Sequence, residues 1–191
     1  MEMNNVKEIL MYLIPSKLFD NFMRINQLYL NYEYDKLFDE FNRELQLDEF
    51  YDKNEFVESL EEEDLGINDI LFWYLEKNDI LLQLDWSGED NKRQVEEFIN
   101  KRLKDKYNVN ERIDTKEVYE YFDKTELKRG EHLIVLFKYL NKQLNKLQFN
   151  LVIFDIGTDS YFITFVPQKV FDKVNDFEAD GIRIQNNNIL M

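Results

Sequence analysis

Two dense apolar segments late in the chain constrain its fold more than any other feature. Residues 149–154 and 161–166 are rich in β-branched and aromatic side chains, which favour strands. The six residues between them are mostly Asp, Gly, Thr and Ser, which are typical of turns. The pattern predicts an antiparallel hairpin. Because both faces of each strand are mostly apolar, we expect helices to cover part of both sides.

The first half of the chain has the periodicity of helices. Apolar residues recur three and four positions apart, which is typical of amphipathic helices with one buried face. Four helices are expected in this way, over residues 6–13, 18–28, 34–45 and 56–60. Pro15 ends the first of them, and Gly66 is expected to end the fourth. Asn68 is expected to cap a fifth helix.

A strand followed by a helix is expected after Asp79. Residues 80–86 form a short apolar run, which predicts a strand buried on both faces. Ser87 is followed three residues later by Asp90, the spacing of a capping box, so we expect the next helix to begin there. Three further helices and a short edge strand are expected over residues 118–122, 133–147, 170–174 and 181–185, respectively, with Pro167 at the start of the third helix.

These patterns together predict an α+β fold. The N-terminal helices are expected to pack on a small three- or four-stranded sheet that includes an antiparallel C-terminal hairpin. The length of 191 residues fits a single domain over residues 1–191. Within it, a helical subdomain over 1–78 and an α+β subdomain over 79–191 are possible.

Composition excludes several classes of function. The sequence has no cysteine, so it has no disulfide, no thiolate zinc site and no cysteine nucleophile. The single histidine, His132, has no identifiable nucleophile beside it, so we expect a structural role. A net charge of −15 argues against binding to nucleic acid or to an anionic membrane surface. No export signal or membrane-length apolar segment is evident, so we expect a cytoplasmic protein without a cofactor.

The excess negative charge is concentrated in one early segment. Between Glu33 and Asp64 there are 14 acidic and 3 basic residues, a net charge of −11. The aromatic residues of this segment recur at helical spacing, so we expect them to point inward while the carboxylates face water. A solvated helical face is the plainer interpretation, and an acidic surface that steers a basic partner is the functional one. Six residues represent that candidate binding face: Glu40, Glu44, Asp48, Glu58, Glu61 and Glu62.

A second candidate site lies at the predicted strand ends. Asp85 ends the first strand, Asp155 follows the second, and Asp159 leads into the third. If the first two strands are parallel and adjacent, Asp85 and Asp155 approach each other, and clustered carboxylates could bind Mg²⁺ or Ca²⁺ or share a proton. Aspartate is also common in turns, because its side chain accepts hydrogen bonds from nearby backbone N–H groups.

Two short motifs carry a resemblance to a known class of protein. The first is Leu84-Asp85-Trp86-Ser87-Gly88-Glu89, and the second is the run from Val152 to Tyr161. Together they resemble patterns in uncharacterised bacterial domains of unknown function, over residues 80–166 at most. The resemblance implies a cytoplasmic α+β protein, assigns no activity and transfers no functional residue.

Two functional hypotheses follow from the sequence. The first is a non-enzymatic interaction protein whose acidic face engages a basic partner, for example an inhibitor that neutralises a cationic toxin as acidic immunity proteins do. The alternative is a small carboxylate-dependent metal-binding enzyme that uses Asp85, Asp155 and Asp159.

Overall fold

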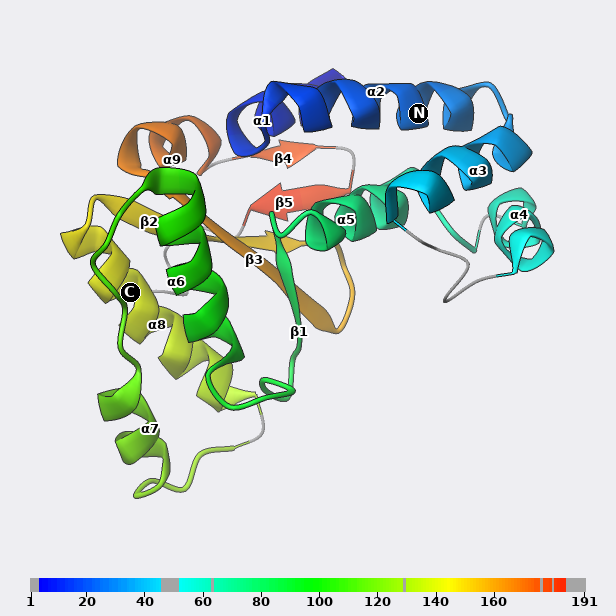
Figure 1. Cartoon of the computed structure of the whole chain (residues 1–191). Helices are drawn as coiled ribbons and strands as arrows, with labels where there is room; N and C mark the ends of the chain where they lie inside the picture. Colours follow the sequence, from blue (N-terminus) through cyan, green and yellow to red (C-terminus); the bar gives the residue numbers. More distant parts are fainter. Residues whose placement is uncertain are drawn as a thin grey trace. The chain divides into compact units, whose positions relative to one another are not determined.

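The computed structural model describes residues 4–45, 52–62, 64–128, 130–175, 177–179 and 181–184. The chain divides into two compact units: a helical unit, residues 1–80, and an α+β unit, residues 81–191. Figure 1 shows helices and an antiparallel sheet, which follow the order along the chain that the sequence predicts apart from one short additional strand, Glu178–Ala179. The predicted α+β class is therefore confirmed.

The described part of the helical unit contains five helices, α1 (Asn4–Leu13), α2 (Ser16–Leu30), α3 (Tyr34–Leu45), α4 (Lys53–Glu61) and α5 (Ile67–Lys77). Asp52 caps α4, because its Oδ1 accepts a hydrogen bond from the backbone N–H of Asn54 at 2.8 Å. Gly66 does not end α4 as expected. It lies at the N-cap of α5, where its N–H donates to Asp69 Oδ2 at 2.8 Å.

Aromatic rings connect four helices of this unit. Phe41 of α3 lies 6.4 Å from Phe56 of α4 and 6.5 Å from Tyr74 of α5, measured between ring centroids. Phe22 of α2 lies 6.0 Å from Tyr74, and Phe38 lies 5.4 Å from Phe56. All five side chains are buried. The prediction that the aromatics of α3 and α4 point inward is confirmed for Phe38, Phe41 and Phe56.

The α+β unit contains a five-stranded antiparallel sheet in the part of the chain that the structure describes. Its strands are β1 (Leu82–Asp85), β2 (Phe149–Asp155), β3 (Ser160–Pro167), β4 (Glu178–Ala179) and β5 (Ile182–Ile184), in the order β1-β3-β2-β5-β4. The predicted hairpin is confirmed as β2 and β3, with Phe154 opposite Phe162. The sheet exceeds the expected three or four strands because Glu178–Ala179 pairs with β5, which therefore lies inside the sheet instead of at its edge.

The first strand differs from its prediction. β1 lies at one end of the strand order and pairs with β3 through Leu82 opposite Ile163. Leu82 and Gln83 are half-buried and Asp85 is exposed, so β1 is not a strand buried on both faces. A run of apolar residues this short does not distinguish an edge strand from a central one, because the periodicity alone carries no information on neighbours.

Over the described residues of this unit, four helices accompany the sheet: α6 (Gln94–Tyr107), α7 (Lys116–Phe122), α8 (Glu131–Lys146) and α9 (Gln168–Val174). The expected capping box at Ser87–Asp90 is wrong, because α6 begins only at Gln94. Glu89 nevertheless stabilises the start of this helix: its Oε1 accepts a hydrogen bond from the N–H of Val95 at 2.8 Å.

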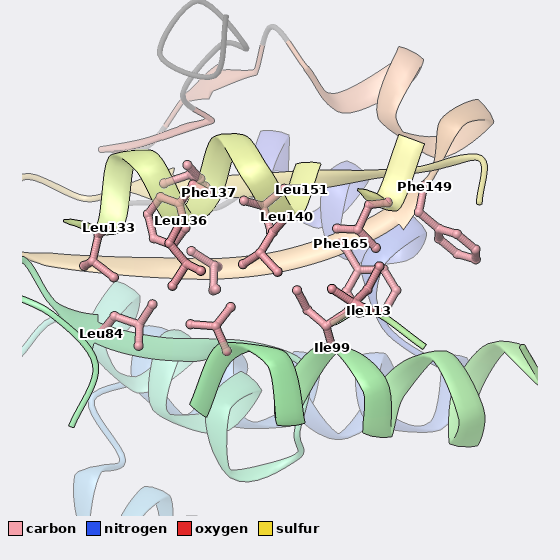
Figure 2. Packing of buried hydrophobic residues seen from close by; sticks show 14 of the residues in the cluster. Leu84, Ile99, Ile113, Leu133, Leu136, Phe137, Leu140, Phe149, Leu151 and Phe165 are labelled. Atoms are coloured by element: carbon pink, nitrogen blue, oxygen red, sulfur yellow. The ribbon is translucent and has the colours of Figure 1, made fainter. Parts of the chain in front are cut away.

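The core of the α+β unit is mainly aliphatic. Figure 2 shows Leu136 and Leu140 of α8, Ile99 of α6 and Leu84 of β1 pointing into one cluster. These four side chains are at most 2 % exposed. At about 25 cal/mol per Å² of apolar surface removed from water, burial of each such side chain contributes roughly 1.5–3 kcal/mol.

One buried amide ties a loop to this core. Asn100 of α6 donates through Nδ2 to the carbonyl oxygen of Ile113 at 2.9 Å, and its Oδ1 accepts from the N–H of Ile113 at 2.8 Å. Ile113 precedes α7 in a segment without regular secondary structure. The side chain of Asn100 therefore forms the hydrogen bonds that the backbone N–H and C=O groups of Ile113 would form with a neighbouring strand or helix turn in regular secondary structure.

Candidate acidic and tyrosine-lined surface

The two units differ sharply in charge. The helical unit has 20 acidic and 7 basic residues, a net charge of −13, whereas the α+β unit has 19 and 17, a net charge of −2. Any surface that depends on negative charge is therefore best sought in the helical unit.

The carboxylates of α3 have basic neighbours within the same unit. Arg24 and Arg43 both contact Glu40, and they approach Glu44 at 4.0 and 3.7 Å. The side chain of Glu40 is only 14 % exposed. Two residues of the predicted binding face thus already have arginine partners, and their charge is largely balanced locally.

The outer turns of α3 are paired as well. Lys53 lies 2.8 Å from Asp39 and 3.4 Å from Asp35, and these carboxylates raise the pKa of Lys53. Lys36 bonds to Glu33 and lowers the pKa of that carboxyl group. Exposed pairs of this kind contribute at most about 1 kcal/mol each, but they reduce the charge available to a partner.

The acidic residues of α4 and the turn after it are different. These residues are exposed, and none forms an ion pair with a residue that the structure describes: Glu55, Glu58, Glu61, Glu62 and Asp64. Phe56 and Leu60 are buried on the other side of the helix. Of the six predicted face residues, Glu58, Glu61 and Glu62 thus form an exposed acidic surface, which we call the α4 surface. Asp48 lies outside the described residues.

The α4 surface opposes the helix dipole. The last turn of α4 contains no basic residue, and Glu61 and Glu62 lie where the partial negative charge of the helix end is concentrated. An acid in that position is unfavourable by roughly 0.3–1 kcal/mol. Folding alone therefore does not account for this arrangement of charge.

A hollow of about 550 Å³ borders the α4 surface. It is formed by the end of α2, the turn before α3, the end of α4 and the start of α5. Its lining residues are Tyr29, Leu30, Tyr32, Tyr34, Leu60, Glu61, Leu65 and Gly66. This volume lies within the range of ligand pockets, about 300–1,000 Å³. We call it the tyrosine hollow, and Glu61 belongs both to it and to the α4 surface.

The three tyrosines form a group of rings. The centroid of Tyr34 lies 6.0 Å from that of Tyr29 and 6.0 Å from that of Tyr32, with interplanar angles of 48° and 66°. Tyr32 is 79 % exposed, which is unusual for a large aromatic side chain. Tyrosine is one of the side chains enriched at the energetic centres of protein interfaces, together with tryptophan and arginine.

The backbone of Tyr32 is strained. The turn after α2 is a Schellman motif, in which the N–H of Tyr32 donates to the carbonyl of Tyr29 and the N–H of Glu33 to that of Leu28, both at 3.0 Å. Tyr32 occupies the left-handed position of this motif with φ 57°. Glycine is usual there, and a residue with a Cβ is disfavoured by roughly 1–2 kcal/mol.

The strand-end aspartates lie at one end of the sheet, but on different strands. β1 and β2 run in the same direction and are separated by β3, so they are about 10 Å apart instead of adjacent. Asp85 Oδ1 accepts from the N–H of Ser87 at 2.7 Å, which is a turn interaction. Asp155 accepts from the N–H of Gly157 at 3.0 Å and pairs with Arg183.

Asp159 and Trp86 lie at the same end of the sheet and form structural contacts there. The carbonyl oxygen of Asp159 accepts from the N–H of Trp86 at 3.1 Å. The indole of Trp86 packs on Gly130, where a Cβ would lie 3.0 Å from the ring. In the described chain, no group of three or more His, Asp or Glu side chains is arranged to hold a metal ion.

Glu89 and His132 also have structural contacts within the α+β unit. Tyr119 donates a hydrogen bond from its hydroxyl group to Glu89, and burial raises the pKa of the Glu89 carboxyl group. The ring of His132 packs edge-on against Phe122, with centroids 5.0 Å apart.

Among the described helices, none has the length and apolar character needed to cross a membrane.

Tyr29 and Tyr32 are functional candidates that the sequence patterns do not reveal. They lie at the end of one helix and in the following turn, so they follow neither a helical stripe nor a motif. The lack of glycine between α2 and α3 is no signal either, because α5 ends in the same way with Asp79 in the left-handed position.

Comparison with known proteins identifies the family but not an activity. Neither the curated proteins nor the solved structures contain a match. A family of domains of unknown function matches residues 27–187, which extends the resemblance expected over 80–166 and includes the whole tyrosine hollow. The chain therefore belongs to the family described as Domain of unknown function (DUF6630).

Proposed function

We propose that this protein is a non-enzymatic interaction protein that binds a basic partner protein through the α4 surface. The observation that carries the proposal is the contrast between α3, whose carboxylates have lysine or arginine neighbours, and α4, whose Glu58, Glu61 and Glu62 have none among the described residues. Unbalanced exposed charge raises the rate of association with an oppositely charged protein.

The proposed binding surface is smaller than the acidic face that the sequence predicts. Glu40 and Glu44 are engaged by Arg24 and Arg43, so a partner would have to displace those contacts to use them. Glu58, Glu61 and Glu62 require no such displacement. An inhibitor of a cationic toxin remains a concrete form of the proposal, because a steered acidic surface suits rapid capture of a basic protein.

A cytoplasmic location and the absence of nucleic-acid partners belong to the same proposal. The lack of cysteine is consistent with a reducing compartment. The net charge of −15 opposes contact with a phosphate backbone.

A peptide-binding experiment tests the proposal. The probe is a fluorescent decapeptide of alternating arginine and serine, with binding followed by anisotropy from low to high salt. The triple variant Glu58→Gln, Glu61→Gln, Glu62→Gln should bind the peptide about 3- to 150-fold more weakly, because each exposed charge contributes roughly 0.2–1 kcal/mol. The affinity of the unmodified protein should fall steeply with salt.

A matched control separates local from global charge. Asp90→Asn, Asp123→Asn, Glu126→Gln changes the net charge by the same amount at three exposed positions of the α+β unit. This variant should retain nearly full affinity. An equal loss in both triple variants, or binding that is insensitive to salt, would reject the α4 surface.

A further inference from the structure

The tyrosine hollow has the chemistry of a site for a cationic side chain. The faces of aromatic rings carry negative electrostatic potential and attract cations within about 6 Å of the ring centre. Tyr29, Tyr32 and Tyr34 contribute three rings to one hollow, and Glu61 contributes a carboxylate. None of the lining residues that the structure describes is basic, so none of them supplies a cation to the hollow.

The strain at Tyr32 is a second, independent observation. A tyrosine with φ 57° and a side chain 79 % exposed gains little from burial, and its backbone opposes folding. Positive φ also occurs at Asp79, Arg93, Asn108 and Gln148, so the backbone alone does not mark a site; at Tyr32 the outlier also lies in the lining of a hollow. The left-handed backbone places the Tyr32 ring next to that of Tyr34, at 6.0 Å, in the wall of the hollow.

The charge around the hollow favours one occupant. Glu61 lines the hollow and continues into Glu58 and Glu62 of the α4 surface, so a basic chain on that surface reaches the hollow directly. Arginine suits this environment better than lysine, because its planar guanidinium stacks on aromatic rings and can donate two hydrogen bonds to one carboxylate.

We propose that the tyrosine hollow binds an arginine side chain of the basic partner, with the guanidinium against the tyrosine rings and Glu61 as its counter-charge. The inference rests on the proposed function, because the partner that docks on the α4 surface supplies the arginine. It adds to that function a specificity that charge alone does not provide: arginine is preferred over lysine at one position.

The test compares two peptides and a variant that removes one ring. Arginine–serine and lysine–serine decapeptides have equal charge, and the unmodified protein should bind the first about three- to tenfold more tightly. Tyr32→Gly should remove most of this preference, whereas Tyr32→Phe should keep it. Because glycine suits the left-handed position, the melting temperature of Tyr32→Gly should be unchanged or higher, which shows that the fold is intact.

Two controls complete the experiment. Tyr121→Ala removes a tyrosine of α7 that is 46 % exposed and should leave both affinities unchanged. Tyr32→Asn also tolerates the left-handed position and should behave as Tyr32→Gly does.

The outcomes distinguish the inference from the proposed function. If Tyr32→Gly binds both peptides normally while the α4 triple variant does not, the hollow is rejected and the α4 surface stands. If neither variant affects binding, both are rejected. If the unmodified protein binds the two peptides equally, the assignment of arginine is overturned.

Discussion

The helical unit and the α+β unit differ in net charge and in the charge at the end of one helix, α4. In the α+β unit, acids and bases nearly balance, and the described helices α6, α8 and α9 have lysines in their last turns, where they favour the helix dipole. The helical unit has a net charge of −13, and α4 ends in acids. Within the helical unit, α3 and α5 have Arg43 and Lys77 in their last turns, so the unfavourable helix end belongs to α4 and not to the whole unit. The comparison indicates that α4 retains a locally unfavourable charge at its surface.

The largest expected effect concerns the aromatic core of the helical unit. Phe41→Ala should lower the free energy of unfolding by about 3–5 kcal/mol, because the ring is fully buried between Phe56 and Tyr74 and the surrounding helices would relax only partly around the cavity. Urea denaturation measures the change. A loss below 1 kcal/mol would show that this unit lacks the tight core that the contrast assumes.

The corresponding test in the α+β unit concerns a polar contact. Asn100→Ala should lower the free energy of unfolding by about 2–4 kcal/mol, because it leaves the buried N–H and C=O groups of Ile113 without their partner. Urea denaturation with Asn110→Ala as an exposed control would measure it. Equal effects of the two substitutions would contradict a structural role for the Asn100 amide.

Relief of strain should produce a smaller change of the opposite sign. Tyr32→Gly should leave the free energy of unfolding unchanged or raise it by up to about 1 kcal/mol, since the gain at φ 57° is partly offset by the greater freedom of glycine in the unfolded chain. Thermal denaturation measures the change. If Tyr32→Gly clearly destabilised the protein, the exposed ring would contribute to folding, and its strained backbone would no longer support a role in binding.

Reversing the charge at helix ends tests the contrast directly. Glu62→Lys should stabilise the protein by about 0.3–1 kcal/mol, because a cation at the end of α4 favours the dipole. The reciprocal variant Lys146→Glu at the end of α8 should destabilise it by a similar amount. Urea denaturation at low salt measures the free energy of unfolding of both variants. If this free energy changed in the same direction in both, the charges at the ends of α4 and α8 would not have the opposite effects inferred here.

The smallest effect concerns pH. Loss of water around the ammonium group, followed by the charge of Arg102, lowers the pKa of Lys106 to about 8, although the residue as a whole is exposed; an unfolded lysine titrates near 10.5. The unfolded chain therefore binds more protons than the folded protein between these pH values, and stability should rise with pH from 8 toward 10.5. Relative to Lys106→Gln, the protein should gain less than about 1 kcal/mol between pH 7.5 and 9.5, because the side chain is partly exposed. Parallel pH profiles of the two proteins would contradict the shift.

Patterns within single elements were predictable from the sequence. The stripe through Leu37, Phe38 and Phe41 and the hairpin of β2 and β3 follow from periodicity, and the structure confirms both. The start of α6 was not predictable, because Glu89 reaches the N–H of Val95 across six residues, beyond the three-residue spacing of a capping box.

The candidate site was predictable only in part. The acidity of α4 is visible in the sequence, but the pairing of Glu40 and Glu44 depends on Arg24, which lies on another helix. The tyrosine hollow collects residues from the ends of four helices, and no local pattern encodes such a meeting point. The sequence alone thus shows where the acidic residues are concentrated, but only the tertiary structure shows which of these carboxylates lack a basic neighbour and could contact a partner.

The two tryptophans lie one on each side of the division between the units. Trp73 belongs to α5 in the helical unit, and Trp86, packed on Gly130, belongs to the α+β unit. Each unit therefore contains its own intrinsic fluorophore. With Trp73→Phe and Trp86→Phe variants, the emission of a single indole can report which half of the chain loosens first on heating and which half responds when a ligand is added.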